Sequence, residues 1–188
     1  MSFMLLGILN AQATGGGAGA FDLLETTTLA SSASSVTFSG LDAYSDYKHL
    51  QIRAVVRSSR VDTNSFIRAR VNGDSGSNYA EHLLRGNGSV VSSDAGTSQT
   101  SIPFGYTPAA SETSGIFTPL VIDLLDFNNT SKNSTFRTLT GYPSSTLNAI
   151  ELRSGLWINT NAVTSIQLYD AFSQNFIAGS RFSLYGVK

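Results

Sequence analysis

The side chains that could support acid–base or nucleophilic chemistry are few and far apart. His49 and His82 are the only two histidines, and the chain has no cysteine. Neither histidine belongs to a motif that pairs it with a nucleophilic serine and a carboxylate. Glu81 directly precedes His82, but adjacent residues of a strand point to opposite faces of the sheet. We therefore interpret both histidines as ordinary members of strands.

Two pairs of aspartates contain the residue type that glycosidases use for catalysis. These enzymes place two carboxyl groups on either side of the scissile bond. Asp123 and Asp126 lie in an apolar run three residues apart, so a strand places them on opposite faces. Asp42 and Asp46 lie in a loop, where capping is the more common role of aspartate. The sequence also contains no phosphate-binding glycine loop and no Gly-x-Ser-x-Gly motif. These observations predict a protein that is not an enzyme and that uses neither a cofactor nor a metal.

A run of oxygen-bearing side chains, Asn-Gly-Asp-Ser-Gly-Ser-Asn, occupies residues 72–78. Such oxygens are the ligands that calcium prefers, but the run lacks the spaced carboxylates and the terminal glutamate of a calcium loop. The Asn-Gly pair accepts the positive φ angles of tight turns. We therefore predict a turn between two strands.

Four arginines form the clearest electrostatic feature. Arg53 and Arg57 alternate with apolar residues in one run, and Arg68 and Arg70 do so in the next. The alternation predicts that they share the solvent-facing sides of two neighbouring strands. They form either a polar interface with an acidic partner or an ordinary solvated surface.

The elements that must position these residues are strands. Apolar and polar residues alternate with period two in many runs, and no useful segment shows the 3.6-residue period of a helix. The patterns predict roughly nine or ten strands among eleven candidate runs, which are residues 21–29, 35–38, 47–57, 66–71, 79–84, 99–106, 117–127, 134–142, 149–158, 163–169 and 181–187. Residues 89–98 read as a small-residue loop. Pro103 indicates an edge strand, and the apolar run 117–127 indicates a central one.

Many short strands separated by turn residues predict an all-β fold. We expect a single antiparallel two-sheet β-sandwich, jelly-roll-like, over residues 21–188, with an extended arm at residues 1–20. An up-and-down barrel is the alternative. The single tryptophan, Trp157, is interpreted as core packing.

Charge is scarce in this chain. Only 13% of the 188 residues are charged and the net charge is −1, whereas about 25% is typical of globular domains. This balance leaves no broad basic surface for nucleic acid, and no apolar run is long enough to span a membrane. Few charges suit a subunit that packs against other subunits, or a β protein whose hydroxyl groups cover its exposed strands.

The arm begins with an apolar cluster on a glycine-rich tether, Gly15-Gly16-Gly17-Ala18-Gly19. Because glycine loses the most backbone freedom on ordering, the tether favours no fixed conformation. The apolar cluster is a candidate docking segment, formed by Phe3, Met4, Leu5, Leu6, Ile8 and Leu9. A secretory signal and a strand added to the chain's own sheet are the alternatives; the first lacks a positively charged start.

Several blocks of the sequence resemble structural proteins of tailed bacteriophages, a group common among phages of aquatic bacteria. The ending, residues 178–188 (AGSRFSLYGVK), is similar to the ending of these proteins. Residues 70–79, and residues 154–157 followed by 162–166, resemble two further blocks. Residues 5–12 resemble the start of phage virion proteins. The likeness touches most of the chain but is poorly specific for a role within the virion.

The resemblance implies a non-enzymatic virion part, assembled in the cytoplasm of the bacterial host. Such proteins are capsid decoration (cement) proteins or tail and fibre components, β-rich and often trimeric. The chain is short for a fibre and has no shaft-like repeat. We therefore expect a homotrimeric capsid decoration protein whose arm docks on the major capsid protein or another virion subunit.

Two alternatives remain open at this point. A tail-associated or fibre-tip protein would bind a host-surface glycan, with Tyr106, Tyr142 and the loop 89–98 as the places to look. A glycan hydrolase on the same fold would use Asp42 or Asp46, although no substrate is suggested.

Overall fold

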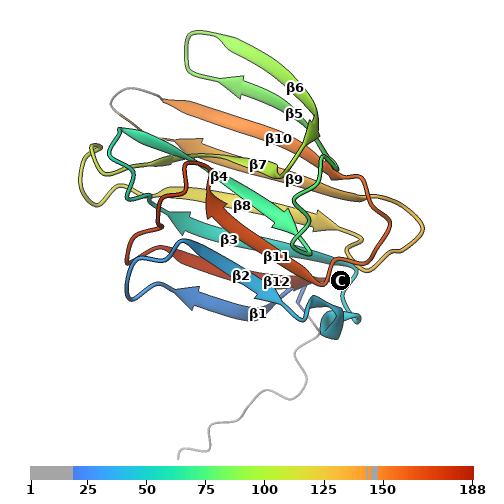
Figure 1. The fold of residues 1–188 in the computed structure, drawn as a ribbon. Helices are drawn as coiled ribbons and strands as arrows, with labels where there is room; N and C mark the ends of the chain where they lie inside the picture. Colours follow the sequence, from blue (N-terminus) through green and yellow to red (C-terminus); the bar gives the residue numbers. More distant parts are fainter. Residues whose placement is uncertain (1–18, 143, 145–147) are drawn as a thin grey trace, which may run out of the picture.

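The computed structural model describes residues 19–142, 144 and 148–188, which fold into two antiparallel β-sheets packed face to face (Figure 1). One sheet has eight strands and the other has four. The predicted all-β sandwich is therefore confirmed. The described part of the chain has twelve strands, slightly more than the sequence predicts.

The eight-stranded sheet has the order β1-β12-β3-β8-β9-β10-β5-β6, and every neighbouring pair is antiparallel. Its strands are β1 (Phe21–Thr28), β12 (Arg181–Val187), β3 (His49–Val56), β8 (Thr118–Leu125), β9 (Ser134–Tyr142), β10 (Ala149–Trp157), β5 (Tyr79–Gly86) and β6 (Val91–Gln99).

The four-stranded sheet has the order β2-β11-β4-β7. Its strands are β2 (Ser35–Ser39), β11 (Ser165–Asp170), β4 (Asn64–Val71) and β7 (Ile102–Pro108). A short 3₁₀ helix, η1 (Leu41–Tyr44), joins β2 to β3. The chain crosses between the sheets repeatedly as it passes from β1 to β12, which is the winding of a jelly roll.

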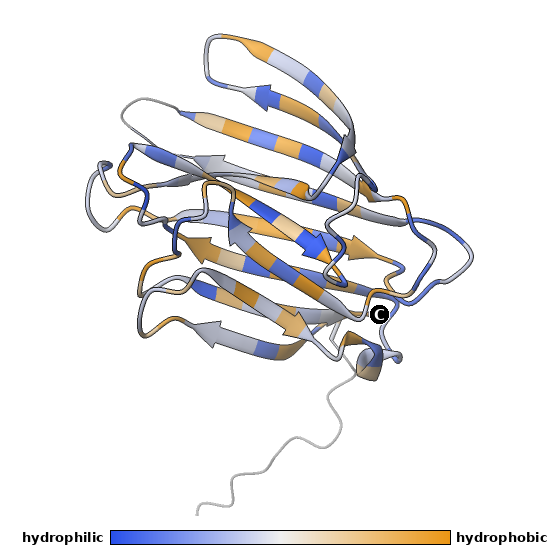
Figure 2. Ribbon diagram, viewed as in Figure 1, coloured by the Kyte–Doolittle hydropathy of each residue, from blue (hydrophilic) through white to orange (hydrophobic). Residues whose placement is uncertain are grey.

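The core lies between the sheets and follows from the period-two pattern. In β3, Leu50, Ile52 and Ala54 are at most 3% exposed, and in β4 Ile67 and Ala69 are fully buried. Each fully buried leucine or isoleucine of this kind contributes about 1.5–3 kcal/mol. The faces predicted for both strands are therefore correct, and Figure 2 shows the same alternation along most strands.

Two sequence predictions about particular strands are confirmed and one is wrong. Pro103 lies in β7, which is an edge of the four-stranded sheet, and β8 lies inside the eight-stranded sheet. Residues 91–99 form β6, although a loop was expected there. The sequence of β6 gives no strand signal because, after Val91, its side chains are small or polar and almost all exposed.

The predicted turn at residues 72–78 is also confirmed. Asn72 and Gly73 have φ angles of 50° and 69°, the left-handed conformation that asparagine and glycine accept most readily. The Asn72 side chain accepts hydrogen bonds from the backbone N–H groups of Thr164 and Ser165, at 2.8 and 2.9 Å. The turn is therefore fixed to the start of β11.

Candidate functional site

The outer face of the eight-stranded sheet, which points away from the core, carries a straight row of apolar side chains. Val121, Leu139, Leu152 and Leu84 are direct cross-strand partners on β8, β9, β10 and β5. Their exposed fractions lie between 36% and 52%. Because directly opposite Cβ atoms stand about 4.5–5.5 Å apart, the row is a continuous apolar band across four strands.

A second apolar row runs beside the first. Ile150 lies opposite Gly86, which lies opposite Val91, and Val55 lies opposite Pro119. Ile150 is 58% exposed and Val91 is 74% exposed. We call the two rows together the outer apolar face. It consists of Val55, Leu84, Val91, Val121, Leu139, Ile150 and Leu152. Contiguous apolar patches of this kind typically mark interaction surfaces.

A network of polar side chains borders the outer apolar face. The Gln51 amide donates a hydrogen bond to Asp123 Oδ1 at 2.7 Å, and Arg53 Nε donates to Gln51 Oε1 at 2.7 Å. Arg137 Nη2 donates to Asp123 Oδ2 at 2.8 Å. Both Asp123 oxygens are therefore paired, as its place in an apolar strand requires. The border is polar and internally hydrogen-bonded, with two guanidinium groups and one carboxylate.

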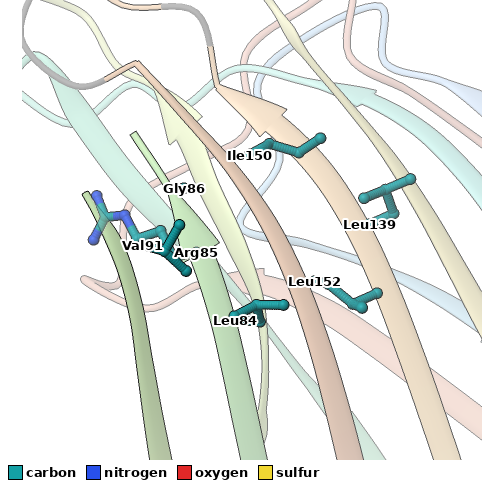
Figure 3. Close-up of a pocket in the computed structure, with 7 residues that line it drawn as sticks. All are labelled: Leu84, Arg85, Gly86, Val91, Leu139, Ile150 and Leu152. Carbon is teal, nitrogen blue, oxygen red and sulfur yellow. The ribbon is translucent and has the colours of Figure 1, made fainter. Parts of the chain in front are cut away.

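Three shallow depressions follow one another across this sheet. The one in Figure 3, of about 230 Å³, shares Leu139 and Leu152 with the next, of about 360 Å³. That second depression shares Asp123 and Arg137 with a third, of about 230 Å³, which Phe21 also lines. The depressions thus form a continuous track from β1 to β6.

One of the four arginines predicted to face solvent has a structural role instead. Arg57 follows β3 and is only 6% exposed. Its Nη2 donates to the Glu112 carbonyl at 2.7 Å, and its Nη1 donates to the carbonyls of Thr113 and Ile116 at 2.6 and 3.0 Å. The prediction that Arg57 faces solvent is wrong, because it fixes the loop between β7 and β8.

The other three arginines do not form one surface. Arg53 lies on the outer face of the eight-stranded sheet, with Cζ 4.4 Å from the Tyr185 ring centroid and 4.8 Å from that of Phe21. Arg68 and Arg70 lie on β4, in the other sheet. The expectation that their two strands are neighbours is wrong because the chain crosses to the opposite sheet between β3 and β4.

The outer face of the four-stranded sheet carries a depression with a largely polar lining. Arg70 Cζ lies 5.0 Å from the ring centroid of Tyr169. The depression has a volume of about 250 Å³. Its lining consists of Ser34, Ser35, Arg70, Gln167, Tyr169, Asp170, Ser173 and Gln174.

One of the two tyrosines suggested for glycan binding, Tyr142, lies in the interior, whereas Tyr106 is partly exposed. Tyr142 is 2% exposed, its hydroxyl donates to the Thr63 carbonyl at 2.9 Å, and burial raises its pKa. Tyr106 packs edge-on against Phe66 at 4.9 Å between centroids, with Arg85 over its ring. Tyr142 therefore belongs to the interior and offers no ring face to a sugar.

The histidines and the paired aspartates are not brought together into a catalytic arrangement. His49 Nδ1 accepts a hydrogen bond from the Asp126 backbone N–H at 2.9 Å. Lys132 binds the Asp126 carboxylate and lowers its pKa. His82 and Glu81 lie on opposite faces of β5, as predicted. These groups orient loops and strands.

Trp157 packs in the core, as predicted, and is 1% exposed. Its indole N–H donates to Asp74 Oδ2 at 2.8 Å, and this bond, together with one from Asn78, lowers the pKa of Asp74. The Asp74 carboxylate also accepts from the Gly76 N–H at 2.8 Å. The carboxylate oxygens of Asp74 therefore stabilise the turn at residues 72–78.

A buried cluster of charges on the inner sides of β5 and β10 could not be anticipated from the sequence. Arg153 Nη1 lies 2.8 Å from Glu81 Oε2, and Arg153 Nε lies 3.1 Å from Glu151 Oε2. Arg85 Nε lies 3.6 Å from Glu151 Oε1. Two guanidinium groups thus balance two carboxylates, which makes the cluster electrically neutral. In the sequence, the cluster is indicated only by the Glu-x-Arg spacing of Glu151 and Arg153. The pairing register of β10 with β5 then brings Glu81 and Arg85 beside them.

Among residues 19–142, 144 and 148–188, no three side chains of histidine, cysteine, aspartate or glutamate are grouped to hold a metal ion. No helix in the same ranges has the length and hydropathy to cross a membrane.

The predicted docking segment of Phe3, Met4, Leu5, Leu6, Ile8 and Leu9 lies outside the described residues, so its docking role stays a prediction.

Comparison of the chain with protein-family models, curated proteins and solved structures finds no match.

Proposed function

We propose that this chain is a non-enzymatic structural subunit of a tailed-phage virion, and specifically a capsid decoration protein. The observation that supports this proposal best is the outer apolar face. Seven valine, leucine and isoleucine side chains occupy a sheet surface that has no covering layer among the described residues. Such a surface suits contact with another protein subunit.

The chemistry around the outer apolar face supports docking better than catalysis. Full burial of one such side chain is worth about 1.5–3 kcal/mol, and half of that is available where the side chain is already half buried. The border formed by Arg53, Gln51, Asp123 and Arg137 is internally hydrogen-bonded, so it can remain hydrated at a rim. An apolar centre with a polar rim is the usual anatomy of a protein interface.

The resemblance to phage structural proteins supplies the candidate partner. The proposal places this chain on the shell, against the major capsid protein or another virion subunit, as a homotrimer. The apolar segment of residues 3–9 adds a second contact with the shell. The low charge of the chain, 13% of residues, agrees with a subunit surrounded by others.

Locating the chain on virions tests this proposal. Virions of the phage that encodes the chain are purified, labelled with an antibody against it and imaged, and the copy number is measured by quantitative mass spectrometry. We expect label over the whole shell and hundreds of copies. Absence of the chain from purified virions would refute the proposal, and label at one vertex would favour a tail protein.

A matched pair of variants tests the surface itself. Leu139→Glu with Leu152→Glu places two charges in the outer apolar face and is expected to abolish binding to shells that lack the protein. Thr37→Glu with Gln167→Glu places the same charges on the other sheet and is expected to leave binding unchanged. Equal binding by the two variants would exclude the outer apolar face as the docking surface.

The second candidate function is a tail-associated protein that binds a host glycan. The polar depression on the four-stranded sheet favours it, because Tyr169 and Arg70 there combine a ring with hydrogen-bond donors. Aromatic rings and polar side chains are the usual means of holding sugars. Loss of cell adsorption by a Tyr169→Ala virion, with label confined to one vertex, would establish this function in place of the first.

A further inference from the structure

We propose that, in the free protein, the outer apolar face is the docking surface for residues 3–9 of the same chain. The proposal concerns the protein before assembly and does not depend on the virion role. In a virion, the shell would displace residues 3–9 from the outer apolar face and take their place.

The two surfaces have matching chemistry. The outer apolar face consists of seven aliphatic side chains between 36% and 74% exposed. The segment carries six apolar side chains within seven residues, and residues 2–20 contain no charged side chain. Packing the segment on this face therefore removes apolar area from water on both sides without burying a charged side chain.

The track of depressions begins where the chain enters the sheet, at Phe21. Phe21 is the first residue of β1 and lines the third depression. Asp123 and Arg137 connect this depression to the second, and Leu139 and Leu152 connect the second to the first. A chain that leaves β1 at Phe21 thus meets a continuous hollow surface that ends on the outer apolar face.

The connecting residues are long enough for this path. Leu139 lies on β9, four strands from β1 in the sheet order, which corresponds to about 19 Å. It also lies two same-face positions along the strands from Phe21, about 14 Å, so the direct distance is about 23 Å. The nine residues 10–18 span up to about 30 Å when extended, and glycines 15–17 permit the required change of direction.

Tethering favours the same molecule over a neighbour. A short flexible connection holds its end group at an effective concentration in the millimolar range. Protein at micromolar concentration offers neighbouring faces at about a thousandth of that value. At such concentrations the segment therefore occupies the face of its own chain.

The absence of cysteine allows a direct test. A Leu6→Cys and Leu139→Cys double variant of the full chain carries only two thiols. Oxidised at low micromolar concentration, it is expected to form an intramolecular disulfide at least tenfold faster than a control with Leu6→Cys and Thr37→Cys. The products are separated on non-reducing gels and identified by intact mass.

Two outcomes of the disulfide experiment would overturn the proposal. Equal rates in the two variants would mean that the segment does not favour the outer apolar face; a strand added to the edge at β1 is one arrangement that would give this result. A disulfide-linked dimer as the main product of the first variant would place the segment on a neighbouring copy.

A second measurement uses no thiols. Replacing Leu5, Leu6 and Ile8 with serine is expected to increase binding of an apolar fluorescent dye several-fold, because the outer apolar face is then uncovered. Adding Leu139→Glu and Leu152→Glu to this variant is expected to remove the increase. The emission of the buried Trp157 confirms that each variant remains folded. Unchanged dye binding in the serine variant would refute the proposal even if the chain proves to be a virion protein.

Discussion

The two sheets of this molecule share one core but present different outer faces. The four-stranded sheet turns Thr37, Gln167 and Arg70 outward. The eight-stranded sheet turns Val121, Leu139 and other aliphatic side chains outward. The first face is polar, and the second is largely apolar. Besides the interior interface between its sheets, the sandwich therefore has one apolar exterior face that none of the described residues covers.

The largest predicted effect separates the inner side of β9 from its outer side. Phe136 is fully buried on the inner side, so Phe136→Ala is expected to lower the free energy of unfolding by about 3–5 kcal/mol. Leu139→Ala, on the outer side of the same strand, is expected to cost about 1 kcal/mol or less in a chain without residues 2–14, because Leu139 is 48% exposed among the described residues. Urea denaturation measures both. Equal losses would show that the outer face is as buried as the core.

The next largest expected effect on stability distinguishes Arg57 from Arg53. Arg57→Met removes three hydrogen bonds to backbone carbonyls and is expected to cost about 3 kcal/mol. Arg53→Met removes a partly hydrated side chain from the outer face and is expected to cost about 1 kcal/mol or less. Thermal unfolding compares the two variants. A similar loss in both would contradict the structural role assigned to Arg57.

The third effect is a pH dependence at Tyr79, beside the turn at residues 72–78. Burial raises the pKa of Tyr79 from 10.0 to about 12. The unfolded chain therefore loses this proton first, and stability is expected to fall between pH 10 and pH 12 by up to about 1.4 kcal/mol per pH unit. Denaturant titrations at several pH values should show a shallower decline in Tyr79→Phe. Parallel declines in the two proteins would exclude this assignment.

The smallest effect exchanges the character of the two outer faces. Gln167→Leu adds one apolar side chain to the polar face, and Leu152→Gln removes one from the outer apolar face. Each is expected to change the free energy of unfolding by less than about 0.5 kcal/mol in a chain without residues 2–14. Dye binding by that shortened chain should fall only in Leu152→Gln. A fall in both variants would remove the distinction between the faces.

The sequence predicts most of the strands because their side chains alternate. The pattern in β3 and β4 identifies the buried side of each strand correctly, and Pro103 marks a true edge. β6 is not predicted because its residues after Val91 are small or polar, so no alternation of apolar and polar side chains marks the strand. The outward apolar residues of β8 indicate a central strand, which is correct, but they also belong to an exposed surface.

The candidate site could not be predicted from the sequence because it depends on register. Val121, Leu139, Leu152 and Leu84 come from four strands, and only their pairing shows that they form one row. The pairing of Arg153 with Glu81 likewise joins residues 72 positions apart. Arg53 and Arg68 illustrate the opposite error. Similar patterns in two consecutive strands predict that the strands are neighbours, but β3 and β4 lie in different sheets.

The position of β12 between β1 and β3 has a consequence for how the chain reaches this structure. Phe21 pairs with Val187, and Leu50 pairs with Gly186, so two early strands acquire their shared neighbour only when residues 181–187 have been synthesised. Pairings between such distant residues slow folding to milliseconds or seconds. Among the described residues, β1 has no other neighbour in its sheet, so its pairing cannot form before residues 181–187 are available, and this edge of the sheet depends on the longest-range contacts of the fold.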